Sequence, residues 1–205
     1  MQVLFEDEDI IAINKPFGIP ATDTALEELL NQKVYIVHRL DTQTTGVLVL
    51  AKNQKTAADL CKIIADKNFK KHYLAVVSGE CEDIGTMEDE LFFDRLKNKS
   101  FVVKKERKGT KHASLTYEKV AQKDDLTLVR VNLLTGRTHQ IRAQFSSRKM
   151  ALFGDGKYGS RHNGDIALHC ESVEFTHPEK HTKVHIKCSL QKDKTPWNAF
   201  FGLDE

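Results

Sequence analysis

Short apolar runs separated by polar turns recur along the whole chain. The clearest run is Val47–Ala51, whose β-branched and leucine residues are typical of a buried strand. Segments 114–120 and 126–133 alternate between apolar and polar residues, which also predicts strands. Further strands are predicted at residues 3–5, 10–13, 72–78, 166–169, 172–175 and 183–188.

Three segments have helical patterns instead. Residues 25–31 predict a short helix, and residues 54–67 predict a longer one capped by Asn53. A third helix is predicted over 139–147, with Thr138 as its N-cap. The side chains expected to face inward from the last two helices are Ala57, Leu60, Cys61, Ile64, Ile141 and Phe145.

Many short strands with few helices predict an α+β fold around a mixed, mostly antiparallel β-sheet with flanking helices and loops. A chain of 205 residues can form one large domain or two small lobes. The polar segment 80–112 can carry an extended hairpin. Because no linker, repeat or low-complexity tract stands out, we expect a single domain over residues 1–205.

The composition, 40% hydrophobic and 29% charged residues, is that of an ordinary soluble globular protein. The sequence has no apolar run near the ~18–20 residues that cross a bilayer. Its acidic start, with four acids at residues 6–9, excludes an ordinary secretory signal. Four cysteines without motif spacing favour a reducing, cytoplasmic setting. We expect a monomer.

The net charge of +2 says little, but the charges are unevenly placed. Within segment 95–111 Glu106 is the single acid among eight cations. Such a basic stripe fits a phosphate backbone, although a solvated hairpin surface would show the same charges. The cations are Arg95, Lys97, Lys99, Lys104, Lys105, Arg107, Lys108 and Lys111.

The turn before the buried strand 47–51 contains the strongest candidate for catalysis. In His38–Gly46 a single carboxylate, Asp41, stands two residues after Arg39 and among threonines. Polar groups at the rim of a rigid sheet are often catalytic. An aspartate that merely caps an ordinary turn would give the same local pattern.

Three other polar segments have side chains suited to the same site. Tyr73 lies in a predicted strand after two lysines, where a plain core role is the alternative. Segment 135–142 holds two arginines, a histidine and a glutamine around a predicted helix start, which favours anions. The glycine-rich segment 152–159 is the third.

These motifs together resemble the RluA-type family of RNA pseudouridine synthases. The match rests on HRLDxxTTG at 38–46, KPxG at 15–18, GRTHQIR at 136–142 and FxHP at 175–178, in that order. Small departures are Thr45, where the family usually has serine, Gln144, where it has histidine, and Ala151–Phe153 in place of a His-Pro turn. The resemblance implies a pseudouridine-synthase-like fold without the small N-terminal RNA-binding domain of many relatives.

The resemblance also implies an activity. A uridine in structured ribosomal or transfer RNA is flipped out, and its base is detached, turned and reattached through carbon 5 without metal or cofactor. Asp41 would be the nucleophile or base, Tyr73 would lie against the uracil ring, and Arg142 would be the basic partner of Asp41. The residues expected to bind RNA are Arg39, Arg137, His139, Gln140, Lys104, Lys105, Arg107 and Lys108.

Three alternatives remain to be weighed. A phosphatase or ATPase that phosphorylates its aspartate would need a second acid two residues on, where Gln43 stands. A zinc site from His169, Cys170, His181, His185 and Cys188 is disfavoured because residues 185 and 188 of one strand face opposite sides. The third alternative is a protein of the same fold that binds or remodels RNA, with little isomerase role.

Overall fold

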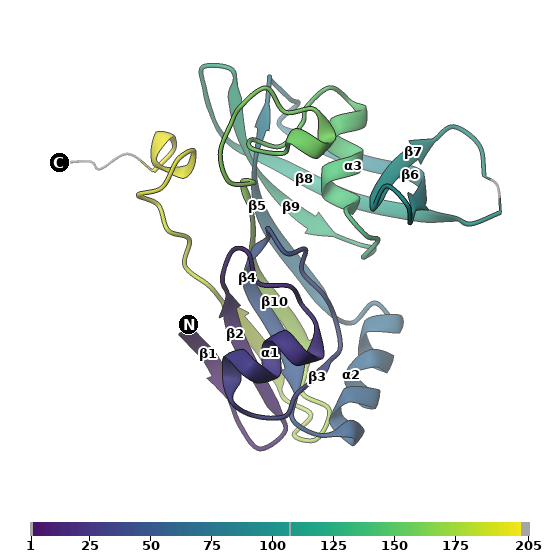
Figure 1. Cartoon of the computed structure of the whole chain (residues 1–205), viewed down its shortest axis with the longest axis vertical. Coiled ribbons are helices and arrows are strands. Elements are labelled where there is room, and N and C mark those ends of the chain that lie inside the picture. Colours follow the sequence, from purple (N-terminus) through teal and green to yellow (C-terminus); the bar gives the residue numbers. More distant parts are fainter. Residues whose placement is uncertain (1, 107, 202–205) are drawn as a thin grey trace. The chain divides into compact units, whose positions relative to one another are not determined.

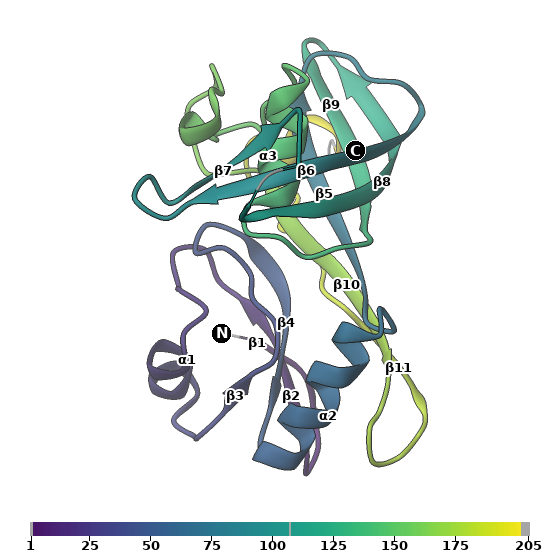
Figure 2. The same cartoon turned by 90° about the vertical axis from the view of Figure 1, so that its right-hand side faces the viewer.

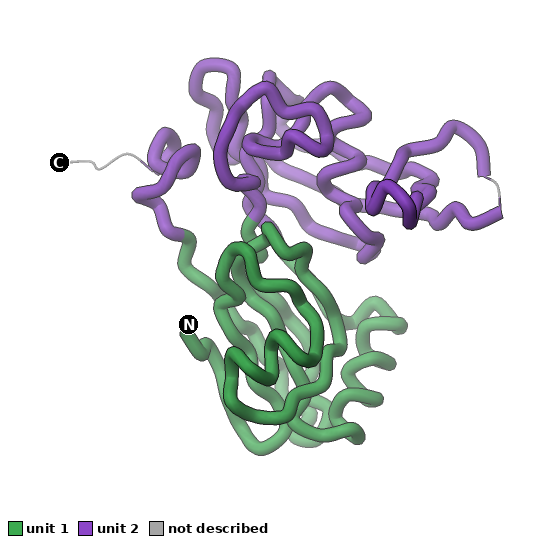
Figure 3. The backbone as a smooth tube through the Cα atoms, in the orientation of Figure 1, with its two compact units in different colours: residues 1–72, 169–190 green, residues 73–168, 191–205 purple. Residues whose placement is uncertain are grey.

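The computed structural model describes residues 2–106 and 108–201. It divides the chain into two compact units. Unit 1 comprises residues 1–72 and 169–190, and unit 2 comprises residues 73–168 and 191–205 (Figure 3). The boundaries at residues 72/73 and 168/169 fall within strands, and the third boundary, at residues 190/191, lies in an irregular segment.

Unit 1 is built on a sheet with the strand order β1-β2-β4-β10, to which β3 adds on β4 and β11 on β10 (Figure 1). Neighbours are antiparallel in this sheet except β4 and β10, which run parallel. The strands are β1 (Gln2–Glu6), β2 (Ile10–Lys15), β3 (Tyr35–Ile36), β4 (Thr45–Ala51), β10 (Leu168–Thr176) and β11 (Lys183–Lys187), and the helices are α1 (Asp23–Leu30) and α2 (Gln54–Ala65).

The central strand of unit 1 is β4. Val47 to Ala51 are completely buried, as the continuous apolar run predicts. β4 pairs with β2 over six residues, and α2 packs against it with Leu60 buried. The catalytic candidate Asp41 therefore stands four residues before a strand that is rigidly held on both edges.

Gly46 allows β4 and β10 to approach each other. Its φ is +106°, and a Cβ atom at this position would lie 2.2 Å from the carbonyl oxygen of Cys170. Both the backbone angle and the space exclude a side chain here.

The Gly46→Ala variant should therefore lose ~3 kcal/mol or more of unfolding free energy. The alanine would have to adopt a strained φ, and the neighbouring backbone would have to move away from its Cβ atom. Urea denaturation of the purified variant measures this loss. Gly79→Ala is the matched control, since Gly79 has a φ of +80° but nothing within 4 Å of the added Cβ. Equal losses in the two variants would contradict the steric account.

Unit 2 contains a sheet with the order β5-β9-β8-β6-β7, in which β9, β8, β6 and β7 pair antiparallel (Figure 2). Figure 2 shows β6 and β7 as a long hairpin beside α3. The elements are β5 (Lys70–Ser78, beginning in unit 1), β6 (Ile84–Asp94), β7 (Lys99–Val103), β8 (Thr110–Lys123), β9 (Leu126–Leu133), α3 (Gln140–Ser147) and the 3-10 turns η1 (Gly156–Tyr158) and η2 (Trp197–Ala199).

The helix α3 is held against β6 and β7 by a small buried cluster. Leu91, Ala113, Ala143 and Tyr158 form its centre. Phe145 is completely buried and contacts the ring of Tyr117, at 5.4 Å between ring centroids. This packing fixes the face of α3 that carries Arg142.

The predicted α+β class with a mixed, mostly antiparallel sheet is confirmed. The predicted cap of the second helix is also present, since the Asn53 side chain accepts a hydrogen bond from the Thr56 N–H at 2.8 Å. Among the described residues, no helix is long and apolar enough to cross a membrane.

Three local predictions are wrong. Cys61 is exposed rather than inward, because α2 buries Thr56 and Leu60. Thr138 does not cap α3: the helix begins after His139, whose backbone is left-handed (φ 52°) and which provides no side-chain cap. The two strands predicted at 166–169 and 172–175 are one strand, β10.

Candidate active site

Asp41 lies at the first position of a tight turn in unit 1. The N–H of Thr44 donates to the Asp41 carbonyl oxygen at 2.9 Å, which closes the turn over Thr42 and Gln43. Asp41 is partly buried, whereas Thr42 and Gln43 are exposed. The turn thus offers a carboxylate at the end of a fully buried strand.

A buried lysine stands beside this turn. Lys15 has an exposure of 0%, and its ammonium donates to the carbonyl oxygens of Pro16 and Ile19 at 2.8 Å and of Thr42 at 3.2 Å. Burial lowers the pKa of Lys15 to about 8, against the opposing effect of the Asp41 charge. At neutral pH the ammonium therefore remains mostly charged next to the carboxylate.

Lys15 joins two motifs that are far apart in sequence. Its bond to Thr42 links the proline-rich turn 15–20 to the Asp41 turn, and the Gly18 N–H donates to the same Thr42 oxygen at 2.9 Å. The sequence showed Lys15 only as part of a turn motif. A lysine at the end of a mostly apolar strand was the available signal for its buried role.

Two neutral histidines form hydrogen bonds with β4. His38 Nε2 accepts the Val49 N–H at 3.0 Å, and burial lowers the pKa of His38 to about 3. His169 lies 3.2 Å from the Cys188 carbonyl oxygen, which can only accept, so its other nitrogen accepts from the Thr45 hydroxyl at 2.8 Å. The hydroxyl at Thr45 is therefore used to anchor β4 to β10.

Arg142 in unit 2 is held by an acid that the sequence did not single out. Its Nε donates to Asp155 Oδ2 at 2.7 Å and its Nη2 to Asp155 Oδ1 at 2.9 Å. The side chains of Arg142 and Asp155 are 5% and 0% exposed. This two-bond geometry fixes the guanidinium plane.

Tyr158 lies beside this ion pair and connects it to the β6–β7 hairpin. The Arg142 guanidinium is 5.0 Å from the centroid of its ring. The hydroxyl of Tyr158 receives the Ser100 N–H at 2.8 Å and lies 3.2 Å from His139 Nδ1. Segment 152–159, marked by the sequence without a role for any residue, therefore supplies both supports of Arg142.

The other polar residues of segment 135–142 make contacts within unit 2. Gln140 is buried, and its Oε1 accepts from the Thr135 hydroxyl at 2.8 Å and the Arg137 N–H at 3.0 Å. The guanidinium of Arg137, which is partly buried, donates to the His112 carbonyl oxygen at 2.8 Å. These contacts shape the turn before α3. That His139, Gln140 and Arg137 bind RNA stays a prediction.

The remaining predicted site residues are distributed over both units. Arg39 is exposed in unit 1 beside Asp41, and Tyr73 is buried in β5 as the first residue of unit 2. In the β7–β8 connection Lys104, Lys105 and Lys108 are exposed. Arg107 lies outside the described residues.

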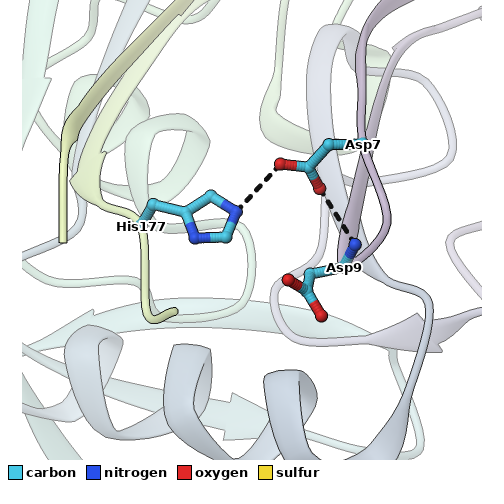
Figure 4. A group of neighbouring side chains, drawn as sticks. All are labelled: Asp7, Asp9 and His177. Carbon is cyan, nitrogen blue, oxygen red and sulfur yellow. Dashed lines mark hydrogen bonds and ion pairs between the residues drawn. The ribbon is translucent and has the colours of Figure 1, made fainter. Parts of the chain in front are cut away.

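A possible metal-binding group in unit 1 is Asp7, Asp9 and His177, whose potential ligand atoms lie within 4.8 Å of one another (Figure 4). Figure 4 shows His177 Nε2 directed at Asp7, at 3.0 Å. Asp7 also receives the Lys180 ammonium at 2.6 Å, and His177 Nδ1 receives the Lys180 N–H at 3.1 Å. The geometry fits a set of hydrogen bonds that joins two distant segments of the chain better than it fits a metal site.

The charge of Asp7 agrees with this structural role. Burial would raise the pKa of Asp7, but the Lys180 ammonium, two backbone N–H groups and His177 together lower it to about 2. The histidines considered for zinc have other neighbours: His169 contacts Thr45 and the Cys188 carbonyl, and His185 lies 3.6 Å from Glu174.

Comparison with known sequences identifies the family. The family described as RNA pseudouridylate synthase matches residues 9–147. An uncharacterised RNA pseudouridine synthase of Mycoplasma pneumoniae is 31% identical over 94% of this chain and 67% of its own length. The ribosomal large subunit pseudouridine synthase C of Buchnera aphidicola is 33% identical over 94% of this chain and 68% of its own.

Solved structures show the same fold. Human RNA pseudouridylate synthase domain containing 1 aligns over 96% of this chain and 86% of its own, with a TM-score of 0.79 and 20% identity. Human RNA pseudouridylate synthase domain containing 4 aligns over 92% and 88%, with a TM-score of 0.76 and 20% identity. With a matching family over most of the sequence, relatives above 30% identity and the shared fold, the chain belongs to the RluA-type family of RNA pseudouridine synthases.

Proposed function

We propose that this chain is the isomerase that converts uridine to pseudouridine in RNA with Asp41 as its catalytic carboxylate. The observation that carries this proposal is the anchoring of the Asp41 turn by Lys15 and by β4, which holds one carboxylate in place beside an exposed arginine. Fixed geometry of this kind is what catalysis by a single side chain requires.

The proposed reaction is an isomerisation, so it leaves the composition of the nucleotide unchanged and exchanges only one proton with water. The bond between N1 of uracil and C1′ of ribose breaks, a bond between C5 and C1′ forms, and the proton on C5 is lost while N1 gains one. The Asp41 carboxylate would act on the sugar as nucleophile or base. The positively charged ammonium of Lys15 lies close enough to Asp41 for the Asp41 charge to act on it.

Tyr73 and Arg142 are proposed as the other catalytic residues. The ring of Tyr73 would stack on the flipped uracil. Arg142 would stabilise the charge of Asp41, and its two hydrogen bonds with Asp155 would hold the guanidinium in a fixed plane for this role. Arg39 would fill the stack that the base leaves.

For the substrate we propose RNA of the large ribosomal subunit, with transfer RNA as the alternative. The support is the similarity to relatives such as the ribosomal large subunit pseudouridine synthase C of Buchnera aphidicola. We further propose that the protein acts in the cytoplasm as a monomer of one catalytic domain, without metal or cofactor.

Release of the C5 hydrogen tests the reaction directly. Ribosomal RNA transcribed with uridine tritiated at C5 should release tritium to water when incubated with the purified protein, in a ratio of one tritium to one pseudouridine. RNA labelled at uracil C6 is the control and should keep its label. Absence of tritium release from both ribosomal and transfer RNA would favour a protein that only binds or remodels RNA.

The basic β7–β8 connection is proposed as a phosphate-binding segment. Changing Lys104, Lys105, Arg107 and Lys108 together to glutamine should weaken RNA binding ~10-fold and flatten its salt dependence. The reason is that each phosphate contact releases counterions from the RNA, so fewer contacts release fewer counterions on binding. Binding titrations at several salt concentrations measure both effects. Replacing Lys55 and Lys62, which pair with Glu179 and Asp59, is the control. An unchanged slope would make the segment an ordinary solvated surface.

A further inference from the structure

The turn between β6 and β7 presents an isolated apolar side chain to solvent. Leu96 is 100% exposed, whereas the nearby strand residue Leu91 is buried. A single exposed leucine is common on protein surfaces and needs no function by itself. What distinguishes Leu96 is the set of hydrogen bonds that holds the turn that carries it.

The turn is braced from inside. Asp94 Oδ1 accepts the N–H groups of Leu96 at 3.0 Å and Lys97 at 3.1 Å, and the Asn98 N–H donates to the Arg95 carbonyl at 3.3 Å. Asp94 is also paired with Lys99 in the sheet. The hydrogen bonds of Asp94 therefore fix the backbone on which Leu96 stands.

The turn is also braced from the neighbouring segment. The Lys157 ammonium donates to the Asn98 carbonyl at 3.1 Å, and the Lys99 ammonium donates back to the Lys157 carbonyl. The Tyr158 hydroxyl also forms hydrogen bonds with the backbone N–H and carbonyl oxygen of Ser100. The turn thus contacts the same segment that holds Arg142, so the backbone that carries Leu96 has little conformational freedom to lose on binding.

Cations surround the exposed leucine. Arg95 and Lys97 flank it in sequence and are exposed, and Lys97 and Lys99 lie 5.8 Å and 5.5 Å from the ring centroid of Phe101. Asp94, the one acid of the turn, is turned inward onto backbone N–H groups. The turn therefore exposes one apolar side chain between two exposed cations in the sequence.

We propose that Leu96 is an RNA-contacting wedge that packs against a base of the RNA, while Arg95 and Lys97 hold the flanking phosphates. A protein partner would need an apolar patch of several hundred Å², and the tip offers one side chain. A nucleic acid needs only one, because an apolar side chain can enter a base step between two phosphates. The proposal rests on the proposed function, which makes RNA the substrate.

The test compares two exposed apolar residues of unit 2. Leu96→Ala should weaken binding to an RNA stem-loop with 2-aminopurine in its loop about tenfold, the effect of losing the burial of part of one leucine side chain. The increase of 2-aminopurine fluorescence on binding should fall with it, while the salt slope stays unchanged because every cation is kept. Leu96→Met should restore both. Ile84→Ala is the control, since Ile84 is 78% exposed beside Asp83 and away from the tip cations.

The outcomes separate this inference from the proposed function. Binding and fluorescence of Leu96→Ala equal to wild type, or an equal effect in Ile84→Ala, would overturn the wedge even if the wild type releases tritium normally. If the wild-type protein binds RNA through Leu96 but releases no tritium, the proposed RNA contact of Leu96 stands and the proposed isomerase activity is contradicted.

Discussion

Replacing Asp41 by alanine is expected to abolish pseudouridine formation while RNA binding stays within about twofold. The rate should fall by at least ~10³-fold, because no other group can take the place of the carboxylate as nucleophile or base. The turn should survive, since it is closed by the Asp41 carbonyl and held through the Thr42 carbonyl, both of which the variant keeps. Tritium release and filter binding on the same RNA measure the two quantities.

The neighbouring residue Gln43 provides the control for this prediction. It is exposed in the same turn. Gln43→Ala should keep a near-normal rate, which excludes a general effect of changing the turn. An Asp41→Ala protein that still forms pseudouridine would remove Asp41 from the chemistry. Loss of binding together with the rate would mean instead that the carboxylate shapes the RNA site.

Replacing Arg142 is expected to cost both stability and activity. Arg142→Met leaves Asp155 as a fully buried carboxylate without the guanidinium, so the unfolding free energy should fall by ~3–5 kcal/mol. Urea denaturation measures this loss. Activity of the single variant would then be ambiguous, because part of the protein would be unfolded.

A double variant separates the two effects. Arg142→Met with Asp155→Leu removes both charges and should regain most of the stability, since an apolar pair of similar size replaces a buried ion pair at little cost. The double variant should still fail to release tritium. A folded double variant with a near-normal rate would show that Arg142 is not the cation that serves Asp41, and Arg137 or another cation, such as Lys15, would be the next candidate.

The sequence predicted the parts of the site that depend on local pattern. The apolar run Val47–Ala51 is the fully buried strand it predicts, and the polar turn before it contains Asp41. The Asn53 cap follows from the same local rules. Motif order added the family, which the comparisons confirm.

Long-range contacts were beyond the sequence. Nothing local shows that Lys15 is buried under three carbonyl oxygens, or that Asp155 is the carboxylate on Arg142. Both depend on where turns meet in the folded chain. Polar residues of segment 135–142 suggested ligand contacts, yet the Gln140 side chain forms hydrogen bonds within its own turn. The Thr138 cap failed because a left-handed residue, His139, leads directly into α3.

Pseudouridine mapping in cells tests the central claim most directly. Total RNA is compared from cells with the wild-type protein, cells without it, and cells that carry Asp41→Ala at the same level. We predict that one or more pseudouridines, expected in large-subunit ribosomal RNA, are present with the wild type and absent in both other strains. An identical pseudouridine map in all three strains would contradict the account.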